Sequence, residues 1–197
     1  VLVEDRLFST LDPTTRRLQL PGGETILCSD TVGFVRRLPH QLVEAFRSTL
    51  EEVAEADLLV HVVDGSAADA ERQVEAVRTV LREIGAGDVP ELLAVNKTDV
   101  ADPGRVDTLL GAHADAIAVS AVSGEGLEKL VDLVGQKLRS LARIVELVVP
   151  YDRGDVLAAL HRDADVLVEV HADEGARIRA RVPDRDLARL ASFVVDE

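Results

Sequence analysis

Between residues 57 and 141 the chain alternates short apolar runs with longer segments of helical periodicity, and this alternation limits the fold more than any other feature. The runs are predicted strands: "DLLVHVVD" (57–64), "ELLAVNKTD" (91–99) and "AIAVS" (116–120). The periodic segments are predicted helices: 69–84, 103–112 and 126–141. Continuous apolar strands are typical of a sheet that is covered on both faces. The alternation therefore predicts an α/β fold, a mostly parallel sheet with helices on both faces.

Two further elements precede this region. "RRLQL" (16–20) and "TILCS" (25–29) flank a Pro-Gly-Gly turn, which predicts an antiparallel hairpin. Apolar residues then recur at helical spacing over 40–56. Cys28 is the one cysteine of the chain and lies in a strand of apolar character, so we expect it to be a reduced core residue.

The pattern changes after about residue 143. Strands are predicted at 144–150, 165–172 and 176–182, and helices at 152–162 and 184–192. This order describes a small C-terminal βαββα domain. We therefore predict two domains, 1–143 and 144–197.

Charge and hydropathy narrow the function classes. The 197 residues include 22 basic and 36 acidic side chains, a net charge of −14, so the chain as a whole repels polyanions and any nucleic-acid contact must be local. No apolar run is long enough to span a membrane and no signal segment opens the chain, which favours a cytoplasmic location without membrane contact. The chain contains no methionine, so we expect Val1 to be an internal position of a longer protein.

Polar motifs follow three of the predicted strands. The hairpin's second strand leads into Asp30-Thr31-Val32-Gly33, the strand at 91–99 ends in Asn96-Lys97-Thr98-Asp99, and the strand at 116–120 leads into Ser120-Ala121-Val122. In open α/β sheets, ligands bind beyond the carboxyl ends of the strands. These motifs are therefore candidates for a ligand site.

The chemistry of these residues suits a guanine nucleotide. The Asp99 carboxylate accepts two donors at once, which matches N1–H and the 2-amino group of guanine and rejects adenine. The Lys97 stem can lie along a base face, and Ala121 can offer its N–H to the guanine carbonyl. Asp30 suits a water-mediated Mg²⁺ contact, and Gly33 lets its N–H approach a terminal phosphate.

Each motif taken alone has an ordinary structural explanation. Asp-x-x-Gly ends many strands in turns, Asn-Lys-x-Asp is equally compatible with a turn, and Ser-Ala carries almost no information. Their order along the chain, each at a predicted strand end, favours the guanine-nucleotide interpretation.

With these motifs the chain resembles the translation-factor-related P-loop GTPases, and most closely the HflX type of ribosome-binding and ribosome-splitting GTPase. The resemblance runs nearly from end to end, through "VLVEDRLFSTLDPTTRRLQLPGG", "DTVGFVRRLPHQLVEAFRSTLEEV", "ADLLVHVVD", "NKTD", "VSAVSGEGL" and "RVPDRDLARLASFVV". It implies a GTPase-type fold, binding of GTP and GDP with Mg²⁺, GTP hydrolysis, and the ribosome, at its large subunit, as partner. Direct RNA contact by this chain is left open.

The resemblance also assigns roles by position. Phe8-Ser9-Thr10-Leu11-Asp12 become switch I, with the Thr10 hydroxyl and Asp30 as the Mg²⁺ ligands. The residues from Asp30 to Gly33 become the switch II anchor, those from Asn96 to Asp99 read the base, and those from Ser120 to Val122 support it. Thr10, Gly33 and Phe34 become the residues next to the hydrolytic chemistry.

One departure from the family is large. No G-x-x-x-x-G-K-[ST] motif occurs in the chain, whereas in the family this phosphate loop lies just upstream of the stretch matched by Val1. The resemblance therefore identifies 1–143 as a G domain without its first strand and phosphate loop, and predicts feeble GTP binding by this chain alone. Two functions remain: a GTP-dependent switch acting on the ribosome, or a non-enzymatic interaction module with a dead nucleotide site.

Phe34 occupies the position where many small GTPases carry a water-orienting glutamine. It cannot hydrogen-bond water, so slow intrinsic hydrolysis is expected, although a core role beside a turn is also compatible with the sequence. His61 is predicted to be a satisfied core histidine, and His40 to begin a helix. Solvated positions are expected for two groups of arginines: Arg36 and Arg37 in a loop, and Arg177, Arg179 and Arg181 on one strand face.

Overall fold

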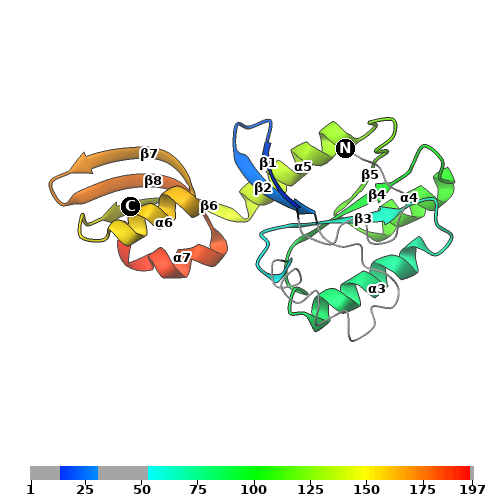
Figure 1. Ribbon diagram of the computed structural model, residues 1–197, viewed down its shortest axis with the longest axis horizontal. Coiled ribbons are helices and arrows are strands. Elements are labelled where there is room, and N and C mark those ends of the chain that lie inside the picture. The colour runs from blue at the N-terminus through cyan, green and yellow to red at the C-terminus, as the bar shows by residue number, and fades with distance from the viewer. Residues whose placement is uncertain (1–13, 31–52, 196–197) are drawn as a thin grey trace. The chain divides into compact units, whose positions relative to one another are not determined.

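The computed structural model describes residues 14–30 and 53–195 (Figure 1). Contacts divide the chain into two compact units, residues 1–135 and 136–197. The division falls within one helix, and we retain 143/144 as a proposed domain boundary. The predicted switch segments at 8–12 and 31–34, together with His40, Arg36 and Arg37, lie outside the described residues.

The first unit contains the predicted parallel sheet. Its strands are β3 (Leu59–Asp64), β4 (Glu91–Asn96) and β5 (Ala116–Ala118), in the spatial order β3-β4-β5 with both pairs parallel. The helices between and after them are α3 (Ala70–Glu83), α4 (Pro103–Ala112) and α5 (Leu127–Ser140). These bounds confirm the predicted α/β alternation.

Helices cover both faces of the central strand β4. Leu93 and Val95 pack with the buried residues of α3 and α4, whereas Ala94 packs with β5 and with Leu130 of α5. All four residues of β4 from Leu92 to Val95 are almost completely buried. This is the two-sided burial that a continuous apolar run predicts.

For β3 the prediction of two covered faces is wrong within the described residues. Val60 and Val62 remain 40% and 58% exposed, whereas Val63, which points to the opposite face, is 3% exposed. β3 has only one strand neighbour in the described sheet, and α3 packs on the Val63 side alone. The run of apolar residues does not reveal that difference between an edge strand and a central one.

The predicted hairpin is confirmed. β1 (Thr14–Gln19) pairs antiparallel with β2 (Thr25–Asp30) around the Pro-Gly-Gly turn. The expected burial of Cys28 is wrong: its side chain is exposed, as are nearly all residues of β1 and β2, so neither face of the hairpin is well covered. Of the helix predicted at 40–56, residues 53–56 are described: Val53 and Ala54 are helical, and the helix has ended at Glu55.

The second unit has the predicted βαββα order. Its elements are β6 (Ala142–Val149), α6 (Gly154–Asp163), β7 (Asp165–Ala172), β8 (Gly175–Pro183), α7 (Asp184–Leu190) and a 3₁₀ turn, η1 (Ala191–Phe193). β8 lies in the middle of the sheet and pairs antiparallel with β6 and with β7. The helices cover one face (Figure 1).

Alternation along β8 sorts its side chains between the two faces. Ile178, Ala180 and Val182 are fully buried against the helices. Arg177 and Arg179 lie on the other face and are exposed, and Arg181 is half-buried there. Arg177 pairs with Glu174 at 3.3 Å and Arg181 with Asp165 at 2.9 Å. These pairs fit the solvated strand face expected from the sequence.

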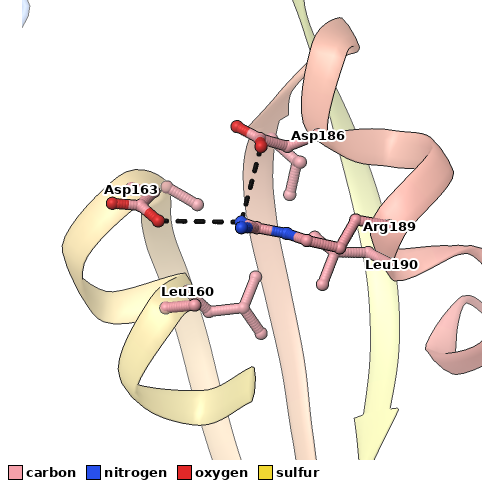
Figure 2. Close-up of a pocket in the computed structure, with 8 residues that line it drawn as sticks. Leu160, Asp163, Asp186, Arg189 and Leu190 are labelled. Carbon is pink, nitrogen blue, oxygen red and sulfur yellow. Dashed lines mark ion pairs between the residues drawn. The ribbon is translucent and has the colours of Figure 1, made fainter. Parts of the chain in front are cut away.

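A small pocket lies between α6 and α7 (Figure 2). Arg189 reaches across it, with Nη2 at 3.6 Å from Asp163 Oδ2 and 3.4 Å from Asp186 Oδ1. The remaining lining is mostly apolar, including Leu160 and Leu190. The pocket is therefore a packing groove between two helices that Arg189 links by ion pairs.

None of the helices within 53–195 has the length and hydropathy of a membrane-spanning segment.

Candidate functional site

The carboxyl ends of β3, β4 and β5 meet at one edge of the parallel sheet. Asp64 and Asn96 are register partners, and the Gly65 N–H donates to the Asn96 carbonyl at 2.8 Å. Across the other pair, the Val119 N–H donates to the Val95 carbonyl at 2.8 Å. The predicted base-reading residues 96–99 and 120–122 therefore follow adjacent strands on the same edge.

Asp99 is held by a buried serine. Ser120 is fully buried, and its hydroxyl donates to Asp99 Oδ1 at 2.7 Å while accepting the Ser123 N–H at 3.1 Å. Within the described chain, no hydrogen bond is made by Asp99 Oδ2. The Asp99 side chain is thus fixed in orientation at an exposed edge with an acceptor available. Ser120, uninformative in the sequence, gains its role from this contact.

Asn96 ties the end of β4 to the loop after β5. Its Oδ1 accepts the Lys97 N–H at 2.8 Å and the Ala121 N–H at 3.0 Å. The Ala121 N–H, expected to serve a guanine carbonyl, is therefore already engaged, so that contact would require sharing or exchange of the donor.

Thr98 makes a second tie between the same two segments. Its hydroxyl and its N–H both donate to the Val119 carbonyl, at 2.8 and 3.3 Å. Val122, by contrast, is 87% exposed and lies outside the core. Together these bonds hold the loop that begins at Ser120 against the segment that carries Asp99.

Lys97 has an unusual conformation and a partner that the sequence did not indicate. Its φ is +63°, the one positive φ at a non-glycine residue among those described. Its ammonium lies 2.8 Å from Asp64 Oδ2. Burial of Asp64 opposes its ionisation, but hydrogen bonds from Lys97 and Ser66 outweigh burial and hold the pKa of Asp64 below its usual value.

The predicted phosphate and metal side of the site is described only at Asp30. This residue ends β2 and is exposed. Thr10, Thr31, Val32, Gly33 and Phe34 lie outside the described residues. Across residues 14–30 and 53–195, no cluster of three or more His, Cys, Asp or Glu side chains could hold a metal ion.

A separate polar network lies on the first unit, around the start of β4. His61 Nδ1 lies 2.8 Å from Glu91 Oε1, and Arg78 Nε donates to Glu91 Oε2 at 2.9 Å. His61 is 9% exposed, in agreement with its prediction as a satisfied core histidine. Burial of Glu91 raises its pKa, but the contacts with His61 and Arg78 prevail and lower it to about 2.

Comparison with known proteins identifies relatives of the whole chain. Residues 1–97 match the family model described as "50S ribosome-binding GTPase". A GTPase HflX of Akkermansia muciniphila is 41% identical over 201 residues, covering 100% of this chain and 46% of the relative. A GTPase HflX of Escherichia coli is 36% identical over 194 residues, covering 96% of this chain and 45% of the relative. The chain thus spans less than half the length of these relatives.

A solved structure supports the fold. A crystal structure of an SsGBP variant superimposes with a TM-score of 0.53 and 30% sequence identity, covering 62% of this chain and 45% of that one. The likeness agrees with the GTPase-type α/β fold expected from the sequence.

Proposed function

The chain belongs to the HflX family of GTPases, and on this premise we propose that it carries the guanine-binding part of a GTP-hydrolysing switch that acts on the ribosome. The alternative, an interaction module with a dead nucleotide site, is not favoured, because relatives along its whole length are named GTPases. We propose that the protein acts in the cytoplasm and that its partner is the large ribosomal subunit, in keeping with the matched family description.

The assembled base site carries this proposal. Asp99 is oriented by Ser120 at 2.7 Å, and Asn96 and Thr98 bind the two segments that would enclose the base. A carboxylate held in this way accepts N1–H and the 2-amino group of guanine together. Adenine offers an acceptor where guanine has N1–H, and it would leave the carboxylate unpaired.

For the phosphate side we propose the roles that the family assigns. Asp30 and Thr10 would hold Mg²⁺, and the exposed carboxylate at the end of β2 is a ligand of the kind Mg²⁺ prefers. When bound, Mg²⁺ neutralises charge on the phosphate oxygens. The N–H of Gly33 would approach the terminal phosphate, and Ser9, Leu11 and Thr31 would belong to the switches around it.

Phe34 bears on the rate of hydrolysis. A phenyl ring cannot align a water molecule, so we propose that turnover is slow until a ribosomal partner completes the site. Single-turnover phosphate release, measured with and without ribosomes, tests this proposal. Fast hydrolysis by the protein alone would contradict it.

The decisive experiment exchanges the base specificity. We would join the phosphate-loop segment of the Akkermansia relative ahead of Val1 and measure competition between GTP and xanthosine triphosphate. Asp99→Asn replaces one acceptor by a donor, so it should lower the affinity for GTP by at least about a hundredfold and favour binding of the xanthine nucleotide. The control is Asp102→Asn, because Asp102 accepts the Arg105 N–H at a helix start instead.

The outcomes separate the two hypotheses. An unchanged GTP preference in Asp99→Asn would show that Asp99 does not read the base. Failure of the unsubstituted joined chain to bind GTP at all would support the interaction module.

A further inference from the structure

An acidic residue at the end of β3 makes a contact with the base-reading motif that no role yet explains. Asp64 Oδ2 lies 2.8 Å from the Lys97 ammonium. We propose that Asp64 is a positioning residue for guanine nucleotides, which holds the Lys97 side chain extended so that its hydrocarbon stem forms a platform for the base. The inference rests on the proposed function of this site.

The main-chain end of Lys97 is fixed first. Its N–H donates to Asn96 Oδ1 at 2.8 Å, and its carbonyl accepts the N–H groups of Val100 and Ala101, both at 3.1 Å. The φ of +63° places the residue in the left-handed region, which a side chain with a Cβ seldom adopts. Surrounding bonds hold this strained conformation, as is common at ligand sites.

Asp64 is fixed as firmly at the other end. Its Oδ1 accepts the Ser66 N–H at 2.9 Å and the Ser66 hydroxyl at 2.6 Å. Both bonds engage one oxygen, and the second oxygen meets the lysine. The carboxylate is therefore oriented by its own turn and does not depend on Lys97 for its position.

Between these two anchors the lysine stem stays open. The Lys97 side chain is 55% exposed and that of Asp64 33% exposed, so the stem is not packed into the core. An exposed lysine ordinarily samples many rotamers, and ordering it opposes binding. Anchored at both ends, the stem is ordered before a base arrives.

A purely structural role for the ion pair explains less. β3 and β4 are already joined along their whole register, from Leu59 opposite Glu91 to Asp64 opposite Asn96. The Gly65 N–H also donates to the Asn96 carbonyl at 2.8 Å, just beyond the last pair. One partly exposed ion pair adds little to such a ladder.

The test is a double-substitution cycle in the joined chain, with GDP and GTP as ligands. Asp64→Asn should lower the affinity for both nucleotides about fivefold, which is the contribution expected of a well-formed, partly exposed ion pair. In a Lys97→Gln background the same change should have no further effect, because the side chain that Asp64 positions is gone. Glu75→Gln, which removes an exposed acid paired with Arg78 at 3.2 Å, is the matched control.

A second measurement needs no nucleotide. The ¹⁵N NMR signal of the Lys97 ammonium, assigned by its loss in Lys97→Gln, should be sharp in the parent and broaden by solvent exchange in Asp64→Asn. If Asp64→Asn proves too unstable to measure, Ser66→Ala provides a milder change. It removes the hydroxyl that donates to Asp64 Oδ1 at 2.6 Å and should lower nucleotide affinity about twofold.

Equal weakening by Asp64→Asn in both lysine backgrounds would overturn the proposal, and so would an unchanged affinity or an unchanged ammonium signal. Failure of the parent to bind any nucleotide would instead refute the proposed function, and the ammonium signal would still report whether Asp64 orders Lys97.

Discussion

The two sheets place polar residues in contrasting ways. In the parallel sheet β3-β4-β5, all strands end on one edge, and residues as distant in sequence as Asp64, Asp99 and Ser120 follow those ends. In the antiparallel sheet β6-β8-β7, neighbouring strands end on opposite edges. Three arginines instead spread along the middle strand β8, where Arg177 and Arg181 pair with nearby acids.

This difference explains why the proposed site lies on the parallel sheet, whereas the antiparallel sheet presents a charged face. Convergent strand ends collect side chains whose bonds fix one another, as Ser120 fixes Asp99 at 2.7 Å. A strand face presents side chains in a row, and each of them contacts only its own neighbours. Four predictions test this contrast, from the largest expected effect to the smallest.

The first prediction tests whether the two cores are separable. Ile178→Ala and Leu93→Ala each empty a position that is at most 1% exposed, and each should lower the free energy of unfolding of its own unit by about 2–5 kcal/mol. Only Leu93→Ala should also abolish guanine-nucleotide binding by the joined chain. Denaturant unfolding and nucleotide titration measure the two effects. Loss of nucleotide binding in Ile178→Ala would contradict this prediction, because it would show that the proposed site depends on the core of the second unit.

The second prediction concerns the loop after β5. Gly126 and Gly124 have φ values of +75° and +83°, but a Cβ at Gly126 would collide with the Ala118 carbonyl, whereas one at Gly124 would meet nothing within 4 Å. Gly124→Ala should cost about 1 kcal/mol in unfolding free energy, from backbone strain alone. Gly126→Ala should cost at least about 1 kcal/mol more and weaken GTP binding, because the loop carries Ser120. Equal effects of the two changes would contradict this.

The third prediction concerns acid stability. The pKa of Glu91 falls from 4.5 to about 2 on folding, so its ionised form stabilises the fold above pH 4.5, and this contribution disappears as pH falls through about 2. The loss should amount to at least about 2 kcal/mol, because one pKa unit corresponds to about 1.4 kcal/mol and the Glu91 side chain, 19% exposed, is only weakly screened by solvent. Glu91→Gln should lack this part of the pH dependence, and the exposed control Glu75→Gln should retain it. Urea unfolding between pH 2 and 5 provides the measurement.

The smallest effect is expected on the open face of β8. Arg181→Gln removes an ion pair at 2.9 Å and should cost less than about 1 kcal/mol, and Arg179→Gln should cost nothing measurable. Neither change should alter binding to an RNA oligomer at low salt, if the face is only solvated. A loss of RNA affinity with a reduced salt slope would instead assign this face to a polyanion.

Much of the architecture could be predicted from local pattern alone. The order of strands and helices from β3 to α7 follows from periodicity, and alternation along β8 separates its arginines from Ile178 and Val182. Both patterns depend on residues close in sequence. That residues 96–99 and 120–122 lie at one edge could be predicted because the ends of parallel strands meet there, and their role in reading the base stays a proposal.

The features that could not be predicted share a physical cause: each depends on residues that are distant in the sequence. Burial of Cys28 and Val62 depends on what packs against the strand, and a run of apolar residues carries no such information. The Asp64–Lys97 contact joins two strand ends through their register. An aspartate before a glycine is otherwise an ordinary end to a strand.

The exposed thiol on β2 has a practical consequence. Cys28 is the sole cysteine and lies two residues before Asp30, the proposed metal ligand. A maleimide dye would therefore attach at one defined position without any engineered cysteine. Its emission would report on the surroundings of the switch as nucleotide and ribosome are added, while its bulk would face solvent instead of the core.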